Sequence, residues 1–319
     1  KVNINRKDYT MYFTSALEEY ESGITYNEIL EDILECVEVE AREEKAIILM
    51  EGQMMINGLE DGEQKEGFMK KVKGGVRTIV ENLKIIANKI LNFIKSIPTR
   101  VREFAKKVFI KLASRKIKER AAAASKVVEV ESNSEAIEKR INDNKEKWKK
   151  LTAGTADRSE KLNELLEAIK TNQFDSMTPD AFKAHLETAK KAYTEWKGKA
   201  DGGKQKVEGE ELTLAVLKSV LKNGPAKAIA DFKFRGFHNA GGETEREAIS
   251  QLNTVAASIK SAEKKTENVD LLKKLRMKLS VLSYVAHEDE TIQLSSILAA
   301  ARKFNLACVI AGTAAAKKE

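Results

Sequence analysis

The chain has 319 residues, of which 42% are hydrophobic and 33% charged, and its net charge is +7. It contains only 3 proline and 17 glycine residues and few aromatics, a composition typical of long amphipathic helices that disfavours both a sheet protein and a disordered chain. The sequence therefore predicts an all-α fold, either a multi-helix bundle or an elongated helical array, with no substantial sheet.

The first apolar residues are interrupted by polar and charged ones, so no signal peptide is expected. Apolar runs stay shorter than the roughly 18 to 20 residues that cross a bilayer, which predicts a soluble chain. Cys36 and Cys308 lie far apart in the sequence. Two scattered thiols favour a reducing compartment over a disulfide, although one long-range bridge stays open.

Charge is segregated in the N-terminal third of the chain. Residues 18–66 contain 16 acidic and 3 basic residues, a net charge of −13, whereas residues 69–120 contain 16 basic and 3 acidic residues, a net charge of +13. Salt screens exposed charges beyond roughly 8 to 10 Å, so the two segments attract each other strongly only if they pack together. We expect them to form one packed unit.

Both of these segments have the apolar periodicity of helices. In the basic one, apolar residues recur at steps of three and four, as on the buried face of an amphipathic helix. The predicted packing stripe consists of Val76, Ile79, Leu83, Ile86, Ile90, Phe93 and Ile94. Because proline lacks an N–H donor and clashes with the preceding turn, Ser96-Ile97-Pro98 is expected to end this helix, and a second basic helix is expected from Val101.

Further helices are predicted along the rest of the chain. The expected ranges are 135–151, 159–170, 178–198, 210–224, 244–265, 269–285 and 291–304. Thr178 is the expected N-cap and Pro179 the first residue of the third of these helices. The Thr-x-x-Glu pattern of residues 244–247 is expected to open another helix as a capping box. Residues 229–237 carry the one weak strand pattern.

These elements suggest three regions. Residues 1–125 form the acidic-then-basic helical region, 126–200 a middle helical region and 201–319 a C-terminal helical region. The glycine-containing segment 199–205 is the best candidate for a linker.

Catalytic chemistry has little support in the sequence. No HExxH, CxxC pair or Walker A motif is present, and no catalytic residue, cofactor or metal ion is predicted. His185 is expected to be a half-buried residue, and His238 to lie in a glycine-rich loop. The acids that follow His287, in the sequence HEDE, point in different directions on a helix and are a poor chelate, so a solvated helix start is expected there.

Residues 69–120 are the main candidate contact segment. Lysine and arginine residues there could neutralise DNA phosphates, or the segment could lie on a membrane surface as a basic amphipathic helix. Burial of the apolar stripe within a helical protein is the favoured interpretation. The residues predicted to make electrostatic contacts are Lys70, Lys71, Lys73, Arg100, Arg102, Lys106 and Lys107.

An acidic helical segment followed by a Glu-Gly-Phe junction and a basic, isoleucine- and phenylalanine-rich helix spans residues 18–109. This arrangement resembles the internal head (inner virion) proteins of large tailed bacteriophages. The resemblance implies a location in the capsid interior or near the portal, after synthesis in the bacterial cytoplasm. It also implies trimming after glutamate, which is one explanation for ends at Lys1 and Glu319, beside boundaries unrelated to processing. It implies no functional residues.

The sequence thus predicts a non-enzymatic virion structural protein that acts by helix-mediated assembly and charge contacts. Its expected partners are other virion proteins (capsid, portal or core proteins) and further copies of itself, with non-specific DNA contact as an option. One alternative is a membrane-active helical protein that uses residues 69–120 during ejection or pore formation. The other is a helical enzyme whose site is unrecognised, which would require His238 and His287 to converge with carboxylates.

Overall fold

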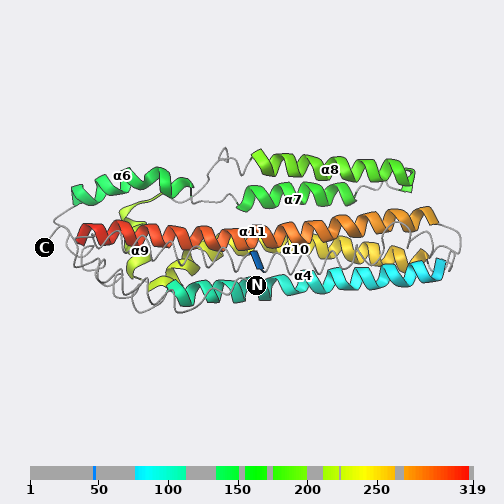
Figure 1. Cartoon of the computed structure of the whole chain (residues 1–319), viewed down its shortest axis with the longest axis horizontal. Helices are drawn as coiled ribbons and strands as arrows, with labels where there is room; N and C mark the ends of the chain where they lie inside the picture. Colours follow the sequence, from blue (N-terminus) through cyan, green and yellow to red (C-terminus); the bar gives the residue numbers. More distant parts are fainter. Residues whose placement is uncertain are drawn as a thin grey trace, which may run out of the picture.

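The computed structural model describes residues 46–47, 76–112, 134–150, 155–170, 175–199, 211–222, 224–262 and 269–315. Within these ranges it contains seven helices and no strand, so the predicted all-α fold is confirmed. The helices lie side by side in an elongated bundle (Figure 1). Almost all of the acidic segment 18–66 lies outside the described residues, and its packing on residues 69–120 stays a prediction.

The helices are, in chain order, α4 (Val76–Leu112), α6 (Ser134–Lys150), α7 (Thr155–Lys170), α8 (Pro179–Lys199), α9 (Leu214–Lys222), α10 (Gly224–Ala262) and α11 (Val269–Ala315). The start of α8 follows directly from its sequence. The backbone N–H of Ala181 donates to Thr178 Oγ1 at 3.3 Å, and that of Phe182 donates to the Thr178 carbonyl at 2.9 Å. Thr178 is therefore the N-cap, and Pro179 occupies the first position, where no N–H is needed, as predicted.

Helix α11 is the central element of the bundle. Its 47 residues correspond to a length of about 70 Å. Helices α4 and α10 lie along one side of it and α7 and α8 along the other, whereas α6 and α9 contact its C-terminal part (Figure 1). Residues 281–283 and 292–294 are buried in unbroken runs. Because consecutive helical residues point about 100° apart, such runs mean that α11 is covered on most sides.

Helix α4 continues through Pro98, so the predicted break at Ser96-Ile97-Pro98 is wrong. A proline inside a helix costs about 3 kcal/mol, because it removes a hydrogen bond and crowds the preceding turn. Ile94, Ile97 and Phe104 flank the proline and are each only 1% exposed. Burying each such side chain contributes roughly 1.5 to 3 kcal/mol, so core packing on both sides of Pro98 outweighs the local cost.

Other predicted helix boundaries are also wrong. Helix α10 passes through residues 244–247, so the expected capping box lies inside a helix, and the weak strand pattern at 229–237 and the expected loop around His238 are helical. Helix α11 passes through residues 286–290, where a break between two helices was expected. Polar residues at 286–290 suggested a helix end, but Glu288 and Glu290 are held there by Lys197 of α8 and Arg100 of α4.

Side chains from all three predicted regions belong to one hydrophobic cluster. It includes Leu83 of α4, Leu166 of α7, and Leu252 and Leu282 of α10 and α11. Helix α4 packs against both α10 and α11. The helix that carries the predicted packing stripe is thus part of the same core as the C-terminal helices.

Candidate functional site

The predicted packing stripe lies on the inward face of α4. Ile79, Leu83, Ile90, Phe93 and Ile94 are each less than 5% exposed, Ile86 is partly buried against the same cluster, and Val76 is the first residue of the helix. The opposite face of α4 is exposed and includes Ile85, which is 52% exposed. Its apolar face is therefore already occupied by the protein's own core.

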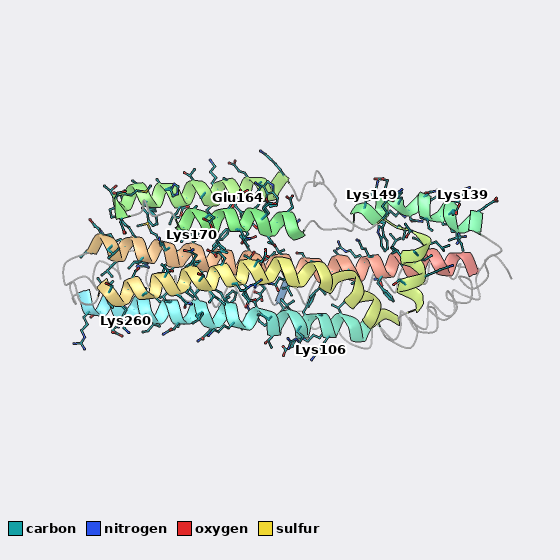
Figure 2. The ribbon with its side chains drawn as sticks, turned by 180° about the vertical axis from the view of Figure 1, so that it is seen from behind. Lys106, Lys139, Lys149, Glu164, Lys170 and Lys260 are labelled. Atoms are coloured by element: carbon teal, nitrogen blue, oxygen red, sulfur yellow. The ribbon has the colours of Figure 1, made fainter. Side chains whose placement is uncertain are left out.

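The predicted electrostatic contact residues fall into three groups. Lys70, Lys71 and Lys73 lie outside the described residues. Arg102, Lys106 and Lys107 are exposed on α4, and Figure 2 shows Lys106 on the outer edge of the bundle. Arg100 differs from all of these, because its side chain is only 19% exposed and faces the interior.

Arg100 belongs to a layer of charged side chains in the middle of the bundle. The sequence did not predict this charged layer. Its Nη2 atom lies 2.9 Å from Oε1 of Glu290 on α11. The guanidinium also lies over the ring of Phe93, with its carbon 4.5 Å from the ring centroid, in cation–π geometry. Glu290 is fully buried. A charge pair thus connects α4 to α11 inside the hydrophobic core.

Three consecutive acids on α11 form the centre of this layer. Glu288 is 7% exposed, Asp289 2% and Glu290 0%. Because consecutive residues on a helix point about 100° apart, the three carboxyl groups face different neighbouring helices. The expected solvated helix start at this position is wrong, because these residues are buried in the interior of α11.

Glu288 faces α8. Its Oε2 accepts a hydrogen bond from Nζ of Lys197 at 2.6 Å, and the two side chains are 10% and 28% exposed. One turn earlier on α11, the hydroxyl of Tyr284 lies 3.3 Å from Oγ1 of Thr194, and the ammonium of Lys190 lies over the tyrosine ring. Polar contacts along one edge therefore fix α8 against α11.

Glu290 faces α4, where it forms its ion pair with Arg100. Burial raises the pKa of Glu290 to about 7, and the charge and hydrogen bond of Arg100 oppose this rise without cancelling it. Removing a carboxylate from water is costly, and one partly exposed guanidinium does not compensate fully. Glu290 therefore keeps its proton to a higher pH than an exposed glutamate does.

Asp289 faces α10. Burial raises its pKa to about 8; a hydrogen bond from Gln293 lowers it, and the charges of Glu245 and Glu290 raise it further. Gln293 Nε2 donates to Oδ2 at 2.7 Å, whereas Oδ1 has no hydrogen-bond partner among the described residues. The pKa of Glu245 on α10 is also raised by burial, against the charge of Arg246. Asp289 thus keeps its proton to a much higher pH than an exposed aspartate does.

Comparison with protein-family models, with curated proteins and with solved structures finds no match. The functional argument therefore rests on the geometry of this chain.

The three histidines lie on three different helices, α8, α10 and α11. His287 precedes Glu288 and is half-buried; burial lowers its pKa, while Glu288 raises it. His185 lies on α8 and is half-buried, as expected. His238 lies on α10, with its side chain outside those described. Within the described ranges, no group of three or more His, Cys, Asp or Glu residues is arranged to hold a metal ion.

A cavity of about 560 Å³ opens at the end of the bundle where α8 and α11 begin. Its lining includes Thr178 and the hydroxyls of Ser258 and Ser261. Lys274 Nζ also lies there and donates to the backbone carbonyl of Asp175 at 3.2 Å. The lysine is thus bound to the loop before α8.

Over the same part of the chain that the structure describes, no helix is long and apolar enough to cross a membrane.

The sequence carried one signal for the charged layer. Residues 281–286 and 292–300 are largely apolar on both sides of the HEDE sequence, without the one-sided pattern of a surface helix. A helix that is apolar all round is buried, so acids in its middle are buried as well. Only the packed structure shows which helix each acid faces.

Proposed function

We propose that this chain is a non-enzymatic structural protein of a bacteriophage virion, located in the head interior or near the portal. It acts as a preformed helical rod that presents basic surface to its partners. The observation that carries the proposal is the division of α4 into two faces, one buried in the protein's own core and one basic and exposed. The sequence resemblance of residues 18–109 to internal head proteins supplies the virion context.

The buried face of α4 favours this proposal over a membrane-active role. An interfacial helix needs its apolar face free to enter the lipid boundary. Here Leu83, Ile90 and Ile94 are at most 2% exposed, and they pack in a core shared with α10 and α11. Membrane binding through this face would require α4 to leave the bundle and to break the contact between Arg100 and Glu290.

The exposed face of α4 supports contacts with polyanions such as packaged DNA. Its exposed cations include Arg77, Lys89, Lys95, Arg102, Lys106 and Lys107, whereas its exposed acids are Glu81 and Glu103. Cations repeat along most of this 37-residue helix, which is about 55 Å long. Phosphate contacts by such a face carry no sequence information, so the expected DNA binding is non-specific and salt-dependent.

The test is duplex DNA binding by the full chain, measured by fluorescence anisotropy at several salt concentrations. Changing Arg102, Lys106 and Lys107 together to Gln should weaken binding and reduce the slope of log K against log salt by up to about 3, close to 0.9 for each lost phosphate contact. The matched control changes Lys139, Lys147 and Lys149 of α6 to Gln, which removes the same charge. Figure 2 shows Lys139 and Lys149 on the opposite side of the bundle from Lys106.

If the two triple variants weaken DNA binding equally, binding depends only on the net charge of the protein and not on the exposed face of α4. Co-sedimentation of the intact protein with anionic vesicles tests the membrane alternative, and binding that is lost when Leu83 is replaced by Ala would support it. Mass spectrometry of purified phage particles tests the virion location. Absence of the protein from particles would overturn that part of the proposal.

A further inference from the structure

The charged layer contains more acid than base where α4, α10 and α11 meet. Asp289 and Glu290 are buried, Glu245 is half-buried, and Arg100 is the cation that contacts Glu290. Full ionisation would place three carboxylates in this region against two guanidinium groups, that of Arg100 and that of exposed Arg246 beside Glu245. Glu288 adds no net charge because Lys197 pairs with it. Repulsion between charges is strong where water is excluded, so this set is stable only with protons on some of its carboxyl groups.

The groups that surround Asp289 come from several helices. From α10, Glu245 faces it, with exposed Arg246 beside that glutamate. From α4, Arg100 reaches Glu290 rather than Asp289. On α11 itself, Gln293 donates one hydrogen bond to Asp289, and Glu290 adds a further negative charge.

The other helices that pack on α11 also carry charged groups. Helix α8 contributes Lys197, which is held by Glu288 next to half-buried His287. Helix α7 carries the half-buried Arg158 near its first turn. Helices α6 and α9 pack on the C-terminal part of α11, where Lys303 lies over the ring of Trp148.

We propose that this layer is a proton-controlled lock: protonated Asp289 allows α10 and α11 to close, and its ionisation beside Glu245 and Glu290 loosens the middle of the bundle. The lock concerns the stability of this fold and does not depend on the proposed virion role. Helix α4 packs against both α10 and α11. Loosening of these two helices would therefore weaken the packing of α4 and expose part of its apolar stripe. Under this proposal, protonation of one carboxyl group controls whether an apolar helix face is available.

The sign of the pH dependence follows from the direction of each shift. The pKa of Asp289 is raised from 3.8 to about 8 and that of Glu290 from 4.5 to about 7, so the folded state holds these protons more tightly than the unfolded state. Their stabilisation is complete below about pH 4, falls as pH rises above the unfolded-state values, and is fully lost above about pH 7 for Glu290 and about pH 8 for Asp289. His287 has a lowered pKa and acts in the opposite direction, but only below its ordinary value of 6.5. Lys278 on α11, whose pKa burial lowers to about 8, also acts in the opposite direction, mainly above pH 8. Between about pH 6.5 and 8, the two carboxyl groups therefore dominate the pH dependence.

The experiment follows thermal unfolding of the full chain from pH 6.5 to 8.5, together with hydrogen–deuterium exchange over residues 244–252 and 285–297, corrected for the intrinsic exchange rate. The unfolding midpoint should fall by about 5 °C over this range, with a loss of protection in both segments. Asp289→Asn is neutral at every pH, can still accept a hydrogen bond from Gln293, and should remove most of the fall. Asp270→Asn is the control, because Asp270 is exposed at the start of the same helix.

Glu245→Gln provides a second variant in case Asp289→Asn does not fold. Without the charge of Glu245, ionised Asp289 is less disfavoured, so the fall should persist but become smaller. A wild-type midpoint that is flat from pH 6.5 to 8.5 would overturn the proposal. A fall of equal size in wild type, Asp289→Asn and Glu245→Gln would overturn it as well, because other groups would then be responsible.

Discussion

Arg100 on α4 and Glu290 on α11 form an ion pair of 2.9 Å in the middle of the bundle, and the glutamate is fully buried. A buried pair is weak evidence for stability, because the cost of removing two charges from water approaches their mutual attraction. A single buried charge that has lost its partner, in contrast, strongly destabilises the folded state. The pair therefore fixes how α4 and α11 align, since any axial shift of one helix would separate the charges.

We predict that Arg100→Met alone lowers the free energy of unfolding by about 3 kcal/mol at pH 8.5. Arg100 holds down the pKa of Glu290, so without it the buried glutamate must either be ionised with no partner or take up a proton from an alkaline solvent. The effect should shrink at pH 5.5, where Glu290, with its pKa raised to about 7, takes up a proton. The double variant with Glu290→Leu should be close to wild type. Urea denaturation of the two single variants and the double variant gives the coupling energy. A double variant as unstable as Arg100→Met would exclude this account.

The sequence predicted the parts of this fold that are local. The stripe at Ile79, Leu83, Ile90 and Ile94 could be identified because its period is that of a helix with one buried face, and the start of α8 could be identified because threonine before proline has a specific capping geometry. Both inferences need only a few turns of chain.

The parts that failed depend on contacts distant in sequence. Glu288 suggested a solvated helix end because its partner, Lys197, is 91 residues away. Arg100 was assigned to the outer contact surface with Arg102, since nothing in the local sequence shows that it faces Glu290. Residues 244–247 have the pattern of a capping box, but Thr244 is fully buried inside α10. In each case, a neighbouring helix changes the environment that the residue's polarity suggested.

Two isoleucines on α4 distinguish burial from mere helix formation. Ile94 is 1% exposed and Ile85 is 52% exposed, although both lie well away from the ends of the same helix. Ile94→Ala should lower the free energy of unfolding by about 2 to 5 kcal/mol, because it removes buried surface and leaves a cavity. Ile85→Ala makes the same chemical change and should stay within roughly 0.5 kcal/mol of wild type. Urea midpoints of the two variants provide the comparison. Equal losses would mean that the exposed face of α4 is covered in solution, by another part of the chain or by a second copy.

Pro98 offers a test of how strongly core packing holds α4 together. Its ring removes the N–H that would donate to the carbonyl of Ile94, and one turn earlier the Ser96 hydroxyl donates to the Phe93 carbonyl at 2.7 Å. Pro98→Ala restores a donor in the helix interior, which is favourable by up to about 3 kcal/mol, but it also frees the unfolded chain, which costs roughly 0.4 to 1 kcal/mol. We therefore expect a net stabilisation of about 1 to 2 kcal/mol, seen as a higher unfolding midpoint in calorimetry.

Pro179 is the matched control, because it occupies the first position of α8, where no N–H is required. Pro179→Ala should leave stability unchanged or slightly lower, since only the unfolded state is affected. If Pro98→Ala instead destabilises the protein, the backbone geometry that proline imposes must be part of how α4 fits against α10 and α11. The helix would then depend on its neighbours for its shape as well as for its burial.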